Sequence, residues 1–312
     1  MGREIGNNLL DAVLDSYVQH PHIGKIGEKH FPKRHLILAV LKKLQYVIFP
    51  GFFDETELRS DNIRSYTKQL LEEIRETLLE QVEKTLRLFK EEYSHVSDDV
   101  TQKRSEEIVD AFLATIPKIR EYLATDIEAA YEGDPAAFSR DEVISSYPGI
   151  YATMVNRIAH ELHVLGVPLI PRVMTEYAHS VTGIDIHPGA TLGRYFFIDH
   201  GTGIVIGETA EIGEHAKIYQ GVTLGALSTR GGQQLKGKKR HPTIEDDVTI
   251  YSGASILGGE TVISGGVVIG GNAFVTKSVP EQTRVSAKMP ELQFKRNKSV
   301  EFQNGEFLNY EI

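Results

Sequence analysis

Two histidines lie where a repetitive stretch of the sequence is interrupted, and they are the first candidates for chemistry. His200 stands in the segment DHGTG and His241 in the segment RHP. A neutral imidazole, with an unperturbed pKa of about 6.5, can accept a hydroxyl proton near neutral pH. The chain contains no cysteine, which excludes disulfides, thiolate metal sites and an acyl-cysteine intermediate. Proton abstraction by a histidine is the chemistry that these residues favour.

The interrupted stretch has a period of six residues. Aliphatic or aromatic residues recur on this grid, which we interpret as broken only twice. They are Ile186, Leu192, Ile198, Ile206, Ile212, Ile218, Leu224, Ile244, Ile250, Ile256, Val262, Val268 and Phe274. Such a period is typical of hexapeptide repeats, in which three short strands and their turns complete one triangular coil. The sequence predicts a left-handed parallel β-helix of about four coils.

The two breaks indicate where loops leave the coils, because a solenoid tolerates insertions at its corners. The first, between Ile198 and Ile206, contains DHGTG and places an aspartate and a histidine beside flexible glycines. The second, between Leu224 and Ile244, contains ALSTRGGQQLKGKKRHP, a loop with five Lys or Arg residues and no acidic one. The basic loop is either a solvated surface element or part of a site for an anionic ligand.

Three apolar stripes with helical spacing precede the repeats, over residues 37–48, 63–86 and 108–123. They predict packed helices whose apolar faces form a core. The fold class is therefore α+β, with an all-helical N-terminal part that covers the first coil of the β-helix. We predict a helical extension (1–124), a helical domain contributing to the active site (125–182), the β-helix (183–282) and a C-terminal tail (283–312).

Composition narrows the function classes. The 312-residue chain has a formal net charge of −9, which argues against nucleic-acid binding. No apolar run approaches the ~20 residues that a membrane helix needs. The N-terminus is charged and amphipathic and has no apolar signal core. We expect a cytoplasmic protein without a membrane partner.

The motifs DIHPGATLG, DHGTGIVIGETA, GVTLGA and RHPTI, preceded by GDPAAF and YATMVNRIAHEL, resemble those of serine O-acetyltransferases. The resemblance covers roughly residues 130 to 290, and the order of the motifs is specific to that family. It implies transfer of an acetyl group from acetyl-CoA, the co-substrate, to the hydroxyl of L-serine. The products are O-acetyl-L-serine and CoA, in cysteine biosynthesis. No permanent cofactor and no metal are implied.

The resemblance also assigns catalytic residues. The general base is the histidine of the DHxTG motif, His200. Its dyad partner is the aspartate of the DIHP motif, Asp185, which fixes the tautomer of the imidazole. His241 is the second histidine of the active site and either helps to bind serine or stabilises the tetrahedral oxyanion.

The substrate residues follow in the same way. Asp134 and Asp199 are assigned to the ammonium group of serine, and Arg240 to its carboxylate, with His241 nearby. Asp134 precedes a proline, so the residues alone favour the N-cap of a helix. His187, His160, His163 and His215 are interpreted as structural or packing residues.

The resemblance also implies residues that bind CoA, an oligomeric state and a protein partner. Ala226, Ser252, Gly253 and Lys288 match CoA-binding positions, although this chain has Tyr251-Ser252-Gly253 where members of the family have GAG. The resemblance implies a homotrimer or a dimer of trimers. The terminal residue, Ile312, matches the isoleucine with which members of the family dock in O-acetylserine sulfhydrylase.

Three other functions fit parts of the pattern. A hexapeptide acetyltransferase for another hydroxyl or amine acceptor shares the coils and one histidine, but does not need Asp134, Asp199 and Arg240. A zinc carbonic anhydrase on the same coil needs three converging histidines, two of them close in sequence, and the grid carries no such pair. A scaffold for the sulfhydrylase is compatible with the enzyme.

Overall fold

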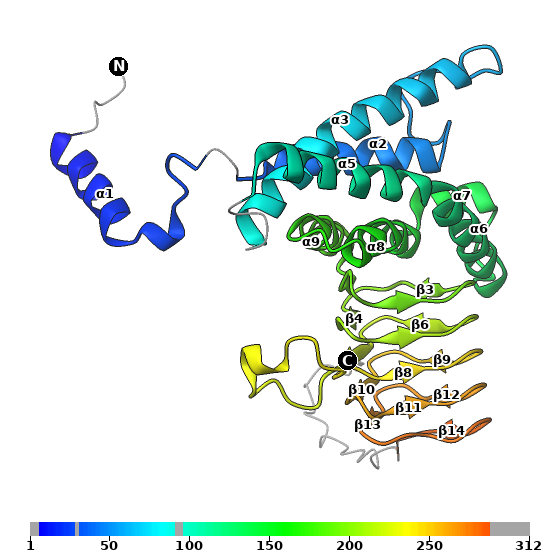
Figure 1. Ribbon diagram of the computed structural model, residues 1–312. Coiled ribbons are helices and arrows are strands. Elements are labelled where there is room, and N and C mark those ends of the chain that lie inside the picture. Colours follow the sequence, from blue (N-terminus) through cyan, green and yellow to red (C-terminus); the bar gives the residue numbers. More distant parts are fainter. Residues whose placement is uncertain (1–5, 29–30, 91–95, 288–312) are drawn as a thin grey trace, which may run out of the picture.

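The computed structural model describes residues 6–28, 31–90 and 96–287. A helical half lies above a column of stacked coils (Figure 1). The α-helices are α1 (Asn7–Gln19), α2 (Arg34–Ile48), α3 (Ile63–Phe89), α5 (Asp98–Ala114), α6 (Ile116–Gly133), α7 (Arg140–Ser146), α8 (Pro148–Val164) and α9 (Ile170–Thr182). No helix in the described ranges is long and apolar enough to cross a membrane.

The predicted apolar stripes form the core of the helical half. On α3, Leu70, Ile74, Leu78, Val82 and Leu86 are all buried, at the expected spacing. The third predicted stripe belongs to two helices, because α5 ends at Ala114 and Pro117 lies in the first turn of α6. Proline is favoured there because its missing N–H has no partner at a helix start.

One apolar core joins the helices on both sides of the predicted boundary at residue 124. It contains Phe112 and Leu123 before that boundary and Ile127, Met154 and Met174 after it. The predicted boundary between a helical extension (1–124) and a second helical domain (125–182) therefore stays a prediction.

The coils form three parallel sheets, one on each side of a triangular column. The first sheet has the strand order β1 (Asp185–Ile186), β4 (Val205–Ile206), β7 (Thr223–Gly225), β10 (Ser255–Leu257) and β13 (Phe274–Val275). The second contains β2 (Thr191–Leu192), β5 (Glu211–Ile212), β8 (Thr243–Ile244) and β11 (Val262–Ile263). The third contains β3 (Phe197–Asp199), β6 (Lys217–Tyr219), β9 (Thr249–Ile250), β12 (Val268–Ile269) and β14 (Arg284–Val285).

The left-handed β-helix is confirmed, but the prediction of about four coils is wrong. Five strands stack in the first and third sheets, so the column has five coils. The fifth coil contains Val275, Val279 and Val285, and Val279 forms a bridge to Ile263 in place of a strand in the second sheet. β14 lies beyond residue 282, the predicted end of the solenoid.

The six-residue grid has a third break that the sequence analysis missed. The inward residues after Ile256 are Ile263, Ile269 and Val275, each one position later than predicted. The predicted anchor Phe274 is 72% exposed. Strand register agrees, because Ile263 pairs with Ile244 and Ile269 with Ile250.

The extra residue lies at the corner after β10, where Gly258 has a φ of 109°. A Cβ atom on Gly259 would stand 2.5 Å from the carbonyl oxygen of Lys239. Lys239 lies at the end of the long basic loop, which leaves the coil above. The third break therefore accommodates the base of that loop.

A buried ion pair attaches the helices to the first coil. The Arg157 guanidinium on α8 binds both carboxylate oxygens of Asp126 on α6, at 2.7 and 2.8 Å. It also donates to the carbonyl oxygens of Leu192 and Gly193 in the first coil. Asp126 accepts a hydrogen bond from the backbone N–H of Phe196, at 2.9 Å. The predicted cover of the first coil by helices is confirmed.

We predict that Ile263→Ala lowers the free energy of unfolding by about 2–5 kcal/mol, because it leaves a cavity inside the fourth coil. Val262→Ala, one residue away on the outer face, is the matched control and should cost less than about 1 kcal/mol. Urea unfolding followed by circular dichroism measures both. The opposite ranking would contradict the one-residue shift of the grid.

Candidate active site

His200 stands on a corner that the two inserted residues push out of the coil. It follows β3, its φ is 57°, and its side chain is 73% exposed. At other corners of the solenoid, a residue with positive φ lies three positions before a side chain that points inward. Gly203, three positions before Ile206, is an example. His200 adopts the left-handed conformation outside that regular position, and Gly201 follows it with a φ of 91°. The insertion therefore presents the imidazole to solvent at a strained position.

Two carboxylates lie around this imidazole. The Asp199 Oδ1 atom is 3.7 Å from the His200 Nδ1 atom. The Asp134 pKa is lowered, first by a hydrogen bond from the Tyr147 hydroxyl at 2.5 Å, then by the backbone N–H of Ala136, with a smaller effect from the nearby His200 imidazole. Two carboxylates therefore lie near the imidazole at this corner.

The structure excludes the N-cap interpretation of Asp134. Helix α6 ends at Gly133, and the next helix, α7, begins at Arg140 with the Ser139 side chain as its cap. Asp134 instead opens the turn that leaves α6, where its carboxylate accepts hydrogen bonds from Tyr147 and Ala136 and lies near His200.

Two side chains that position Asp134 were missed in the sequence. Tyr147, the N-cap residue of α8, donates to the Asp134 carboxylate. The Lys217 ammonium on β6 donates to the carbonyl oxygen of Gly133, at 2.7 Å, and lies over the rings of Phe197 and Tyr219. No motif contains either residue, because contacts between distant segments bring both to this position.

Asp185 lies on β1, where its backbone pairs with Val205. Within the part of the chain that the structure describes, its carboxylate makes no hydrogen bond or ion pair. The carboxylate beside the His200 Nδ1 atom is that of Asp199. The dyad of Asp185 and His200 is not formed in this structure and remains a prediction for the substrate-bound state.

His241 lies at a different corner, where the long loop returns to β8. Its Nδ1 atom accepts a hydrogen bond from the backbone N–H of Thr209, at 3.0 Å. A Cβ atom on Gly207 would stand 2.1 Å from the His241 ring, so only glycine leaves room for the imidazole there. Burial, and then the charge of Arg240, lower the His241 pKa to about 4. The imidazole is neutral at neutral pH, with its proton on Nε2.

Arg240 is held by an acidic residue that the sequence analysis did not single out. Its guanidinium forms an ion pair with Glu208, and its backbone N–H donates to the Thr209 hydroxyl, at 2.9 Å. Glu208 and Thr209 belong to the segment GETA, which supplied part of the resemblance. The ion pair therefore orients the Arg240 guanidinium, but Glu208 already balances part of its positive charge.

The four histidines interpreted as structural or packing residues all make contacts within the chain. His160 Nδ1 lies 2.9 Å from the carbonyl oxygen of Pro188, and His215 stacks on the ring of Tyr195. His187 Nδ1 accepts from the backbone N–H of Gly189, and burial lowers its pKa to about 4. His163 packs edge-on against His187. In the described residues, no group of three His, Asp or Glu side chains is arranged to hold a metal ion.

The structure does not bring the two candidate histidines together within one chain. His200 lies between the third and first sheets, and His241 between the first and second. The proposed CoA residues divide in the same way, since Ala226 follows β7 and Ser252-Gly253 follow β9. Lys288 and Ile312 lie outside the described residues. One chain therefore carries the described candidate residues at separate corners.

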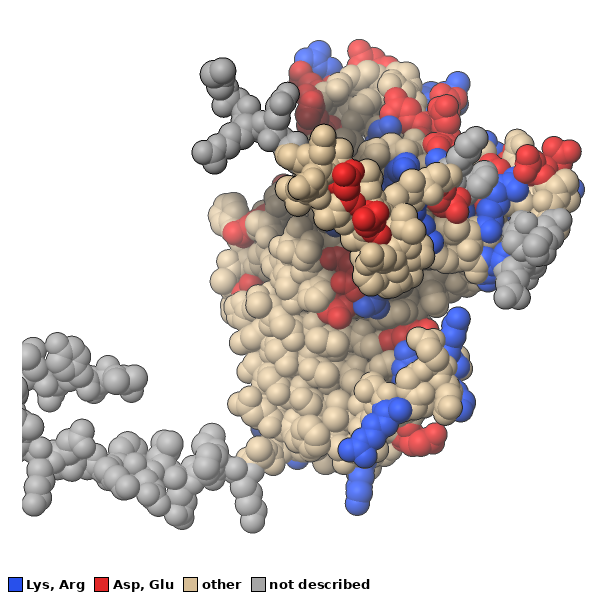
Figure 2. Space-filling model, turned by 90° about the vertical axis from the view of Figure 1, so that its left-hand side faces the viewer, with Lys and Arg blue, Asp and Glu red and all other residues tan. Residues whose placement is uncertain are grey.

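The basic loop stands at the surface. Arg230, Lys236 and Lys238 are exposed, whereas Lys239 binds the carbonyl oxygen of Thr209 and the Glu211 carboxylate. In Figure 2 much of the solenoid surface carries neither sign of charge, while Asp and Glu side chains gather over the helical half. The loop is a local source of positive charge in an acidic chain.

The relatives and solved structures that resemble this chain include several serine acetyltransferases. No protein-family model matches the chain. A serine acetyltransferase of Synechococcus elongatus is 44% identical over 227 residues, which are 70% of each chain. That of Bacillus subtilis is 48% identical over 126 residues, which are 55% of its length. The crystal structure of serine acetyltransferase isoform 3 from Entamoeba histolytica, in complex with cysteine, has a TM-score of 0.70 at 37% identity and covers 93% of this chain and 96% of its own.

The solenoid, its enlarged corner and the exposed histidine define an acyltransferase of the hexapeptide-repeat class. Within that class, the chain belongs to the serine acetyltransferase family.

We predict that the stability of the protein falls as the pH is lowered from 6.5 toward 4, partly because of His241. The folded-state pKa of about 4 lies below the unfolded value of 6.5, so the unfolded chain binds the extra proton in this window. His241→Asn removes that contribution and should give a shallower curve. Urea unfolding of both proteins at several pH values measures the difference, and parallel curves would contradict a buried neutral His241.

Proposed function

We propose that this chain transfers the acetyl group of acetyl-CoA to the hydroxyl of L-serine, giving O-acetyl-L-serine and CoA. The observation that carries the proposal is the His200 corner, where an imidazole stands beside two carboxylates in a chain of this family. An amino-acid acceptor brings an ammonium group, and carboxylates are its natural partners. The Entamoeba relative in complex with cysteine, an amino acid close to serine in shape, supports an acceptor of this size.

His200 is proposed as the general base. It takes the proton of the serine hydroxyl while the hydroxyl oxygen attacks the thioester carbonyl of acetyl-CoA, and the tetrahedral intermediate then expels the CoA thiolate. Asp199 and Asp134 bind the serine ammonium group, with Tyr147 and Lys217 holding Asp134 in place. Asp185 is proposed to orient the imidazole once substrate closes the corner.

His241 and Arg240 are proposed to complete the site. Because Thr209 donates to His241 Nδ1, the Nε2–H of the neutral imidazole is left to donate to the developing oxyanion. Arg240 binds the serine carboxylate, which replaces part of its pairing with Glu208. These groups come from a second copy of the chain, because one chain holds them at a separate corner. A homotrimer or a dimer of trimers is the assembly we propose.

Other parts of the proposal rest on the family alone. Acetyl-CoA is the co-substrate, and Ala226, Ser252, Gly253 and Lys288 are proposed to bind its CoA moiety. O-acetylserine sulfhydrylase is proposed as a partner through Ile312, and the cytoplasm as the location. Transfer to a different small hydroxyl or amine acceptor is the alternative that the assay below separates.

We predict that the wild-type protein releases CoA from acetyl-CoA with L-serine, and not with a panel of sugars and other amines. His200→Ala should lower kcat by about 10²–10⁴-fold, as loss of a general base does. His215→Ala, a corner histidine stacked on Tyr195, is the matched control and should stay near wild type. A folded His200→Ala protein with wild-type turnover would remove His200 from the mechanism.

A second prediction tests the shared site. Chains with His200→Ala and chains with His241→Ala should each be nearly inactive. An equal, randomly assembled mixture of the two, unmixed oligomers included, should recover about one quarter of wild-type activity, because two intact corners meet at that frequency in a symmetric ring. The measurement is CoA release after co-expression of differently tagged chains. Mixing His200→Ala with the double variant is the control. No recovery would place both histidines in a site within one chain.

A further inference from the structure

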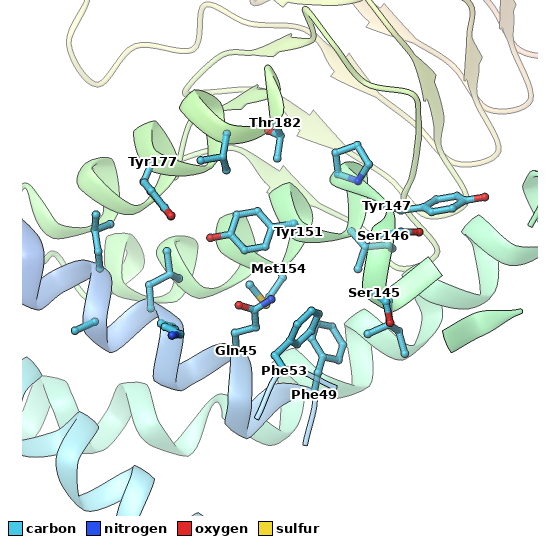
Figure 3. Close-up of a pocket in the computed structure, with 18 of the residues that line it drawn as sticks. Gln45, Phe49, Phe53, Ser145, Ser146, Tyr147, Tyr151, Met154, Tyr177 and Thr182 are labelled. Carbon is cyan, nitrogen blue, oxygen red and sulfur yellow. The ribbon is translucent and has the colours of Figure 1, made fainter. Parts of the chain in front are cut away.

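Two hollows of the described structure lie outside the candidate active site, and their linings differ. The larger, of about 680 Å³, lies between α2, α8 and α9, and Figure 3 shows Phe49, Phe53 and Tyr151 among the side chains that line it. Apolar contact is non-directional, so this lining does not specify a ligand. The smaller, of about 380 Å³, is lined by charged side chains, and we call it the basic hollow.

The basic hollow lies where the helices meet the first coil of the solenoid. Lys90 is the C-cap of α3, Arg172 lies in the first turn of α9, and Lys236 comes from the long basic loop. His163 of α8 and His187 of the first coil also line the hollow, and none of its lining residues is acidic. Segments far apart in the chain therefore place three cations around one space.

Two of these cations have no carboxylate partner. Among the described residues, Lys90 and Lys236 form no ion pair, whereas Arg172 pairs with Glu176 one turn further along α9. The Lys90 ammonium lies at the wall of the hollow, because a Cβ atom on Gly166 would stand 3.9 Å from its Nζ atom. Like charges held around one space repel each other. The basic hollow therefore favours an anion as its ligand.

Neutral N–H groups add hydrogen-bond donors to these charges. The Nδ1 atom of His187 accepts a hydrogen bond from the backbone N–H of Gly189, so the proton of the ring is on Nε2. Burial, and then the charge of Arg172, lower the pKa of His187 to about 4, which keeps the ring neutral at neutral pH. The Arg172 backbone N–H, in the first turn of α9, has no acceptor among the described residues. Both groups can donate to an oxyanion bound beside them.

A strained turn forms one wall of the basic hollow. Leu169 has a φ of 63° and a ψ of −50°, and the Ile170 N–H donates to the carbonyl oxygen of Pro168, at 2.7 Å. This is the rare γ-turn with positive φ, which is costly for a residue with a side chain. Strained backbone of this kind concentrates at ligand sites. The turn also starts α9 at the hollow, which places Arg172 there.

We propose that the basic hollow binds a doubly charged oxyanion, phosphate or sulfate, either free or as the ester group of a small metabolite. Three cations and two neutral donors suit a group with several acceptor oxygens and more than one negative charge, whereas one carboxylate would leave two cations unbalanced. A volume of about 380 Å³ lies within the range of small-molecule sites and leaves room for an organic part. Lys236 then gives the basic loop a role beyond that of a solvated surface.

The basic hollow is separate from the site proposed for serine and acetyl-CoA. Neither Arg240 nor His241 lines it, and none of the described CoA candidates does. The two sites are neighbours, because a Cβ atom on Gly189 would stand 3.0 Å from the Cγ atom of Glu208 and 3.2 Å from the Nε2 atom of His163. Glu208 is the partner of Arg240. Oxyanion binding itself does not depend on the proposed reaction.

Titration calorimetry with phosphate and with sulfate tests the proposal. Saturating CoA is present, so that any phosphate site of the acyl donor is occupied, and chloride keeps the ionic strength constant, because salt screens exposed charges. Both oxyanions should still bind to the wild-type protein. Arg172→Gln should weaken binding by at least about tenfold and Lys90→Gln several-fold, because each removes a positive charge. Lys238→Gln, exposed on the same loop but outside the hollow, is the matched control and should bind as the wild type does.

Two further comparisons keep the test decisive. Circular dichroism shows whether each variant is folded, and Lys90→Gln breaks no ion pair, so it stays informative if Arg172→Gln does not fold. Glycerol 3-phosphate that binds more tightly than phosphate identifies an ester as the occupant, whereas equal or weaker binding identifies the free ion. No phosphate binding in the presence of CoA would overturn the proposal, as would equal affinities in the wild type, Arg172→Gln and Lys90→Gln, whatever the acetyl-transfer assay gives.

Discussion

The stacking of each coil on the coil below is the constraint on which the rest of the structure depends. Successive strands in each sheet exchange backbone hydrogen bonds, and one inward residue on each side pairs with the same side of the next coil, as Ile198 does with Ile218 and Ile218 with Ile250. An extra residue within a strand would move every later side chain to the wrong face. Insertions therefore leave the column at corners, and both candidate histidines lie on such insertions. The repetitive core thus decides where chemistry can be placed.

A second constraint connects that column to the helices. Asp126 is fully buried on α6 and Arg157 nearly so on α8, and their ion pair also binds three backbone groups of the first coil. A buried charge without its partner is strongly destabilising, so the pair fixes the orientation of α6 on the solenoid. Helix α6 ends two turns later at Gly133, directly before Asp134. The position of Asp134 beside His200 is therefore a consequence of a joint that has no catalytic role.

Much of the fold could be predicted from the sequence, because a period of six is a local signal repeated along the chain. The third break was missed because neighbouring apolar residues hide it. Val262 and Ile263, Val268 and Ile269, and Phe274 and Val275 fit the grid equally well, and only the stacking shows which of each pair points inward. The fifth coil was missed for a further reason, because Val279 follows Val275 after four residues instead of six.

The residues of the candidate site likewise fall into two groups, those that a local sequence pattern shows and those that only tertiary contacts show. His200 and His241 were found because an insertion is visible in the sequence, and Asp134 because a motif contains it. Tyr147 and Lys217 act through contacts between segments far apart in the chain, and no local pattern marks them. Glu208 lies in a motif, but only the structure shows its ion pair with Arg240. The N-cap interpretation of Asp134 failed because α6 continues to Gly133, so the proline after it follows a helix instead of starting one.

Charge gives the last argument for a site shared between chains. The His200 corner carries the carboxylates of Asp134 and Asp199, whereas the His241 corner carries Arg240 and Lys239, partly balanced by Glu208 and Glu211. A zwitterionic amino acid needs both kinds of partner within a few ångströms. The His200 corner offers the carboxylates, whereas the carboxylates of the His241 corner are already paired with its cations. Interactions that stay open to water are weak. In the assembly that we propose, two facing corners from different copies supply both charges and exclude water, with the imidazole of His200 opposite the Nε2–H of His241.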